Sequence, residues 1–152
     1  VKWIGKDPQR FNELVKLFLS DETRVVQVAA WPLSYAVQAH PALIKPHFGK
    51  LIRNLRNPGL PDAVKRNTVR IFQEIDAPAR FHGELMHTCF GFIESMTEKP
   101  AIKAFALTVL HNLSTQYPDI RPELKTIIED RWEYESPAFK SRGRKILKAL
   151  AS

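Results

Sequence analysis

The stretch VKRNTVRIF at 64–72 has three counterparts elsewhere in the chain. They are VVQVAAWPL at 25–33, IKAFALTVL at 102–110 and FKSRGRKIL at 139–147. Each copy has an apolar residue first, a small residue fifth and an apolar residue ninth, and all but the earliest carry a lysine second. Their first positions lie 39, 38 and 37 residues apart. A period close to 40 is typical of helix pairs that stack into an α-solenoid.

Apolar residues recur at helical spacing along the rest of the chain, which predicts an all-α protein. No segment shows the strict alternation of a half-buried strand. Asp7 before Pro8, and Ser136 before Pro137, match the residue preferences of helix starts. Pro32 is expected to kink the second helix. We expect eight helices, at residues 8–18, 25–37, 43–55, 64–75, 81–93, 100–113, 120–132 and 137–150.

The order of residue types in these copies resembles the second helix of a HEAT repeat. In that family the helix carries an apolar residue, then Lys or Arg, then alanine fifth and leucine ninth, and the last three copies match this order well. The first copy departs from it, with Val26 in place of the base. HEAT repeats also tend to have an aspartate in the turn before this helix. Asp21 and Asp62 match that feature, whereas the third and fourth copies have no aspartate there.

The resemblance covers nearly the whole chain and implies a right-handed α-solenoid of about four HEAT-like helix pairs, or eight helices. It implies one domain over residues 1–152, with repeats at approximately 7–40, 41–77, 78–117 and 118–152. Neighbouring pairs in such folds share one continuous core. The small fifth residue then allows two helices to approach closely.

The last copy differs from the others in its charge. Arg142 and Arg144 stand at positions where the earlier copies have mostly apolar residues. Terminal repeats need a polar outer face to stay soluble. We therefore expect the last helix to cap the solenoid, with both arginines on its outer face and Ser152 near the end of the stack.

The chain has 152 residues and a formal net charge of +7, but its charges are unevenly distributed. Residues 45–70 contain seven bases and one acid, whereas residues 119–135 contain six acids and three bases. A positive net charge favours a polyanionic partner.

No apolar run approaches the roughly 20 residues of a membrane span, so no membrane association is expected. The first residues, VKWIGKDP, lack the apolar core of a signal peptide. The single cysteine, Cys89, cannot form an internal disulfide. These features favour a cytoplasmic protein.

The repeated lysines at Lys65, Lys103 and Lys140 allow two interpretations. They could form a ladder of bases on one edge of the molecule that meets phosphates or an acidic partner. The resemblance to HEAT repeats implies instead that they pair with acids between the helices of neighbouring repeats. Charges on helices are commonly solvated or paired in this way.

A second group of bases extends this candidate surface. Arg66 and Arg70 lie four residues apart on one helix, and the preceding helix carries further bases. In an α-solenoid the second helices line the concave face, where solenoids bind partners. Aromatic residues are not interleaved with these bases, which weakens the case for nucleic acid. The candidate partner-binding residues are Lys45, Arg53, Lys65, Arg66, Arg70 and Lys103.

The sequence gives no support for a metal or catalytic site. His82, His87, His111 and Cys89 are not spaced to share a helix face, whereas zinc needs three or four converging ligands. Cys89 lies among apolar residues and is expected to be a core residue. We find no phosphate-binding glycine loop, zinc-protease motif or nucleophile elbow. We therefore expect no cofactor, no metal and no catalytic residue.

Two functions remain open at this point. The first is a non-catalytic HEAT-like interaction scaffold that holds an acidic protein partner on a concave basic face. The second is binding of a nucleic-acid phosphate backbone, because the chain resembles HEAT-like DNA glycosylases in helix-pair architecture. The catalytic residues of those glycosylases do not map onto this sequence.

Overall fold

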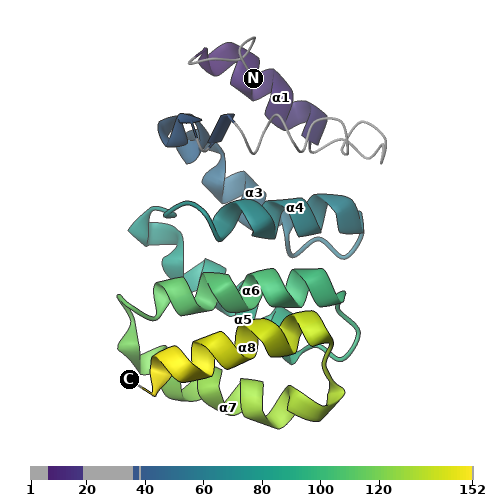
Figure 1. Cartoon of the computed structure of the whole chain (residues 1–152). Helices are drawn as coiled ribbons and strands as arrows, with labels where there is room; N and C mark the ends of the chain where they lie inside the picture. Colours follow the sequence, from purple (N-terminus) through teal and green to yellow (C-terminus); the bar gives the residue numbers. More distant parts are fainter. Residues whose placement is uncertain (1–6, 19–35, 38, 152) are drawn as a thin grey trace. The chain divides into compact units, whose positions relative to one another are not determined.

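The computed structural model describes residues 7–18, 36–37 and 39–151, and in these ranges the chain is helical without strands. Seven α-helices lie in the described residues, rather than the eight expected (Figure 1). The second expected helix, with its kink at Pro32, lies outside the described residues except for the buried Ala36 and Val37. The helices are α1 (Pro8–Phe18), α3 (Phe48–Asn54), α4 (Asp62–Phe72), α5 (His82–Glu94), α6 (Pro100–Leu113), α7 (Arg121–Arg131) and α8 (Pro137–Leu150).

The chain divides into two compact units, Val1–Phe81 and His82–Ser152, which are described separately below as unit 1 and unit 2. The division lies close to the expected boundary between the second and third repeats at 77–78.

The predicted helix starts are confirmed at both marked positions. The Asp7 carboxylate accepts a hydrogen bond from the Gln9 amide at 2.9 Å at the start of α1. The Ser136 hydroxyl accepts one from the Phe139 amide at 3.2 Å at the start of α8. Each cap satisfies an amide that has no partner inside its own helix.

The prediction of an α-helix at 43–55 is wrong for the first half of that range. Residues Pro41–His47 form a 3-10 helix, and the α-helix begins only at Phe48. Pro46 explains the difference, because it has no amide hydrogen and its ring collides with the carbonyl four residues earlier. The fourth helix ends at Phe72 rather than Ile75.

In unit 1 an aromatic cluster connects α3, α4 and the short 3-10 turn Ala79–Phe81. The Phe48 ring stacks on Phe72, with centroids 5.6 Å apart, and on Phe81 at 6.4 Å. Phe48 and Phe72 are almost completely buried. Stacked rings bury large apolar areas, so this cluster holds the second helix pair together.

In unit 2 the helix α6 is the central element. It packs against α5, its partner in the same pair, and against α8 of the following pair, while α7 packs against α8 (Figure 1). Most of its side chains are consequently buried, including Ile102, Ala106, Leu107 and Leu110. This is the sharing of one core between neighbouring pairs that the repeat pattern predicts.

The small fifth residue is buried in each described copy, as Thr68, Ala106 and Gly143; Ala29 lies outside the described residues. The Thr68 hydroxyl donates to the Val64 carbonyl at 2.7 Å, so its burial leaves no polar group unsatisfied. At Gly143 an added Cβ would lie only 2.9 Å from a Trp132 ring carbon and 3.1 Å from Ile128 Cγ2. Any larger residue there would require the side chains of Trp132 and Ile128, or α8 itself, to shift.

The prediction that Arg142 lies on the polar outer face of the last helix is wrong. Its guanidinium donates to the Thr108 hydroxyl at 2.7 Å and to the Ala104 carbonyl at 3.3 Å, and it lies over the Phe105 ring. Arg142 therefore binds the preceding repeat, because its position on α8 faces α6. Arg144 is exposed.

None of the helices in the described residues is both long enough and apolar enough to cross a membrane.

Replacing Gly143 with alanine should lower the free energy of unfolding of unit 2 by about 1 kcal/mol. Overpacking costs about 1–3 kcal/mol, and the better helix propensity of alanine offsets about 1 kcal/mol of that. Gly91→Ala on α5 is the control, because an added Cβ there meets nothing within 4 Å. It should stabilise the same unit by up to about 1 kcal/mol. Hydrogen exchange of the α6 amides measures both changes; equal stabilisation by the two variants would contradict the packing described for Gly143.

Candidate functional site

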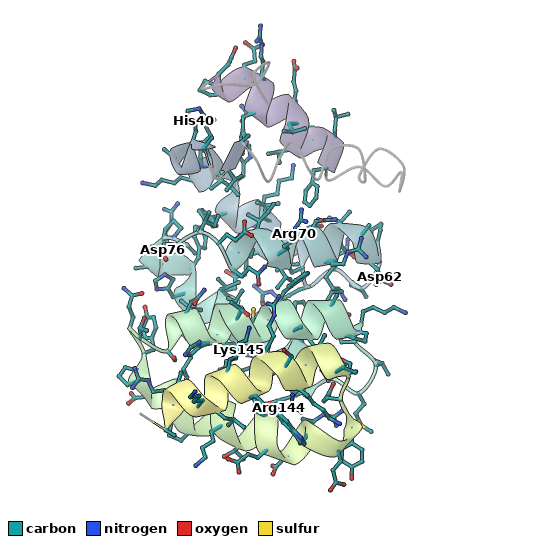
Figure 2. All side chains as sticks on the ribbon, viewed as in Figure 1. His40, Asp62, Arg70, Asp76, Arg144 and Lys145 are labelled. Carbon is teal, nitrogen blue, oxygen red and sulfur yellow. The ribbon has the colours of Figure 1, made fainter. Side chains whose placement is uncertain are left out.

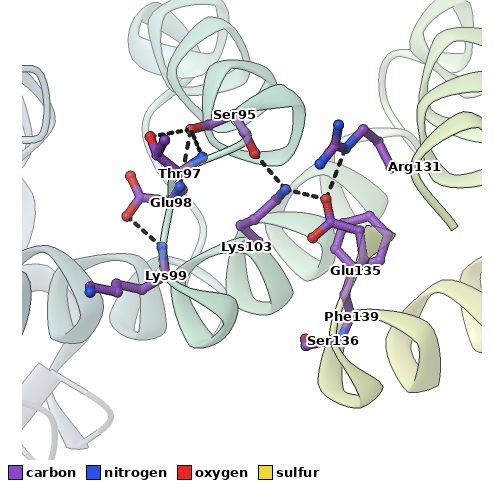
Figure 3. Close-up of polar contacts among 9 residues, drawn as sticks. All are labelled: Ser95, Thr97, Glu98, Lys99, Lys103, Arg131, Glu135, Ser136 and Phe139. Atoms are coloured by element: carbon purple, nitrogen blue, oxygen red, sulfur yellow. Dashed lines mark hydrogen bonds and ion pairs between the residues drawn. The ribbon is translucent and has the colours of Figure 1, made fainter. Parts of the chain in front are cut away.

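Lys103, the repeated lysine of the third copy, is buried, with a relative exposure of 2%. Its ammonium donates to the Ser95 carbonyl at 2.7 Å and forms an ion pair with a carboxylate oxygen of Glu135 (Figure 3). It also lies 5.5 Å from the centre of the Phe139 ring. Lys103 thereby connects the α5–α6 loop with the turn before α8.

Glu135 is shared by two bases. The same carboxylate oxygen accepts a hydrogen bond from Arg131 Nε at 2.8 Å (Figure 3). The side chains of Lys103 and Glu135 are only 3% and 7% exposed, and Arg131 is 19% exposed. A charged group taken out of water needs ion-pair or hydrogen-bond partners to be stable. In this cluster both Lys103 and Arg131 have the Glu135 carboxylate as that partner.

Two interpretations of the repeated lysines were open: pairing with an acid between neighbouring repeats, or contact with a partner. The contacts of Lys103 agree with the first. Its acid comes from the turn before the second helix of the next repeat, the region where HEAT repeats tend to carry an aspartate. Sequence reasoning missed Glu135 because it looked for aspartate there. A carboxylate directly before the N-cap Ser136 was the available signal.

Lys103 cannot contact a partner, because its ammonium is enclosed and engaged. It is therefore removed from the six candidate partner-binding residues. Lys65 and Lys140, at the equivalent positions in the other copies, are half-buried.

The five remaining candidates lie in unit 1, and we call them the basic surface: Lys45, Arg53, Lys65, Arg66 and Arg70. Lys45, Arg53 and Arg66 are exposed. Arg66 and Arg70 follow Asp62 along α4 at spacings of four residues, which places all three on one face of the helix. Asp62 and Arg70 are labelled in Figure 2. The rest of that helix is largely buried, through Val64, Asn67, Thr68, Val69, Ile71 and Phe72.

Arg70 has an unusual feature on this face of α4. It is half-buried, and its Nε atom is buried without a hydrogen-bond partner. A buried donor without an acceptor costs free energy that a suitable anion could recover. Among the described residues, no other buried side-chain nitrogen or oxygen is left in this state.

The histidines and the cysteine considered for a metal site do not converge. His82 is buried and its Nδ1 lies 2.8 Å from the Tyr117 hydroxyl, with the two rings edge to face. Cys89 is fully buried, and burial raises the pKa of its thiol to about 12, which keeps it protonated and unreactive. The expectation that Cys89 is a core residue is confirmed. Within the described ranges, no three acids, histidines or cysteines are grouped as metal ligands would be.

The geometry and repeat pattern agree with a comparison against protein families. A family model described as a HEAT repeat domain matches residues 1–150. The chain belongs to the HEAT repeat family. The comparison with curated proteins and the comparison with solved structures each found no match.

Membership in the HEAT repeat family agrees with the fold described above. The all-α architecture and the helix pairs of unit 2 are those of an α-solenoid built from HEAT repeats. HEAT repeat domains typically serve as scaffolds for protein interactions and are generally non-catalytic. The repeated small, apolar and basic positions of the sequence are thus features of HEAT repeat packing.

Replacing Lys103 with alanine should destabilise unit 2 of this HEAT repeat domain by about 3 kcal/mol. Removing one partner of a buried ion pair leaves the other charge poorly compensated, and Arg131 can only partly neutralise Glu135. Hydrogen exchange of the α6 and α8 amides would measure the loss. Lys140→Ala is the control, since it removes the same lysine one repeat later from a half-buried position and should cost under about 1 kcal/mol. Losses of similar size in both variants would contradict the structural role of Lys103.

Proposed function

We propose that this HEAT repeat domain is a non-catalytic scaffold that binds an acidic protein partner through the basic surface of unit 1. The second helices of HEAT pairs line the concave side of a solenoid, so α4 would present Arg66 and Arg70 to a partner on that side. The bases concentrated in residues 45–70 would attract such a partner over a distance of about 8–10 Å at physiological salt.

The observation that carries this proposal is the state of Arg70. Its unsatisfied Nε–H, together with a terminal N–H of the same guanidinium, matches the two oxygens of a carboxylate. A small turn of this half-buried side chain toward a bound carboxylate would give Nε the acceptor that it lacks. Arg66, one helical turn earlier and exposed, would hold a second acidic group.

A protein carboxylate suits this surface better than a phosphate backbone. A nucleic-acid groove needs a continuous row of exposed bases, and Lys103, one of the bases expected in that row, is buried against Glu135. Aromatic side chains that could stack on bases are not interleaved with Lys65, Arg66 and Arg70. Nucleic acid remains a second candidate because of the net charge of +7.

Fluorescence anisotropy with a labelled ten-residue polyglutamate peptide tests the proposal on the full chain. Arg66→Glu combined with Arg70→Glu should weaken binding by more than about tenfold, since hydrogen bonds to charged groups contribute about 1.5–3 kcal/mol each. Arg70→Lys keeps the charge but removes Nε, and it should weaken binding by about threefold or more.

The matched control is Lys145→Glu, which makes the same kind of charge reversal at an exposed position of unit 2 (Figure 2). It should leave the affinity for polyglutamate within about twofold. A duplex DNA of the same net charge is the competing probe. Tighter binding of DNA than of peptide, with an affinity that falls steeply with salt, would replace the proposed function by nucleic-acid binding. Equal losses in the control and the Arg66/Arg70 variant would also contradict the proposal.

A further inference from the structure

A surface depression on unit 2 has the opposite charge character to the basic surface. It has a volume of about 530 Å³ and lies where α7 and the 3-10 turn Trp132–Tyr134 meet α8. We call it the acidic–aromatic pocket, and its lining residues are Glu129, Asp130, Trp132, Glu133, Tyr134 and Leu147. Tyr134 is 75% exposed, which is unusual for a large aromatic side chain in a folded domain.

Both aromatic rings of the pocket already hold cations of the chain itself. The guanidinium of Arg144 lies 5.5 Å from the centre of the Trp132 ring, and that of Arg131 lies 5.6 Å from the centre of the Tyr134 ring. The negative face of an aromatic ring attracts a cation at such distances, and tryptophan does so most strongly. The pocket is therefore built from groups that select positive charge.

The two arginines are held very differently. Arg131 is fixed by its hydrogen bond to the buried Glu135 and is mostly enclosed. Arg144 is exposed, and within the described ranges its only polar or ring partner is Trp132. An exposed side chain with one weak contact is easily displaced, so the Trp132 ring is available to another cation.

The carboxylates around the rings are available in the same way. Asp130 and Glu133 are exposed and form no ion pair within the part of the chain that the structure describes. Glu129 lies 3.8 Å from Lys125 in an exposed pair, which contributes little. A cation placed over Trp132 would therefore meet acceptors that are not already used.

We propose that the acidic–aromatic pocket binds a lysine or arginine side chain from a basic segment of a partner protein. The incoming cation replaces Arg144 over Trp132, and Asp130 and Glu133 accept its hydrogen bonds. The carboxylates around the two rings attract a cationic segment and repel nucleic acid. The pocket and the basic surface thus recognise partners of opposite charge, and this proposal does not depend on the proposed function.

Titration of the full chain with a hexa-arginine peptide tests the proposal, with the indole N–H signal of Trp132 in an NMR spectrum as the readout. That signal, assigned by its loss in Trp132→Phe, should shift in a saturable manner. Asp130→Asn combined with Glu133→Gln should weaken binding by about fivefold. Glu123→Gln, at an exposed position of α7 outside the pocket, should have no effect beyond about 1.5-fold.

The variant Arg144→Gln tests whether the peptide competes with Arg144 for the Trp132 ring or responds only to the net charge of the protein. It removes the displaced cation and should tighten peptide binding by about twofold to fivefold, the strength of an exposed cation–π contact. Lys145→Gln changes the net charge equally at the adjacent exposed position and should tighten binding less. The proposal is overturned if the Trp132 signal does not shift, or if the two variants have equal effects. A shift of the same signal on raising the protein concentration alone, with dimers in sedimentation, would also overturn it, because the occupant would then be a second copy.

Discussion

The buried ion pair between Lys103 and Glu135 is the constraint around which unit 2 is organised. The ammonium has three donors, of which the Ser95 carbonyl and the Glu135 carboxylate receive two, while the Phe139 ring lies close by. These partners come from the α5–α6 loop, the turn before α8 and α8 itself. An enclosed charge cannot tolerate the loss of such partners, so the pair fixes where successive helices of two repeats must lie. Apolar burial alone, which has no direction, would not fix that register.

Exposed bases occur in both units, whereas the acidic–aromatic pocket brings several exposed acids together at one place in unit 2. The exposed bases of Lys45, Arg53 and Arg66 lie in unit 1, whereas the acids of the acidic–aromatic pocket lie on α7 and the turn that follows it in unit 2. HEAT repeat domains typically mediate protein interactions, and the two proposed sites of opposite charge would allow two partners of opposite sign to be told apart. The repeat positions that pack the core are common to the copies, whereas these surface charges are particular to single repeats.

Much of the fold could be predicted from the sequence because helix periodicity and caps are local signals. The start of α6 at Pro100 and the caps at Asp7 and Ser136 follow from residues within one turn of each helix start. The error at 43–55 came from overlooking Pro46, which is also local. The roles of Lys103 and Arg142 were harder, because each depends on a contact more than 30 residues away along the chain. The resemblance to HEAT repeats implied a paired lysine at Lys103 but did not identify Glu135 as its acid, and Arg142 was expected on the outer face. Only the packing of neighbouring repeats shows that Lys103 is buried and that Arg142 faces α6.

Lysine footprinting of the unmodified chain by a water-soluble acetylating reagent tests the central claim most directly, since it needs no substitution. In the free protein Lys103 should stay unreacted while Lys45 and Lys145 react readily, because only the exposed ammonium groups can be reached. On addition of the polyglutamate peptide, Lys45 and Lys65 should become protected and Lys145 should not. Acetylation of Lys103 at the rate of Lys145, or protection that spreads evenly over all lysines, would contradict a basic surface confined to unit 1 and a structural Lys103.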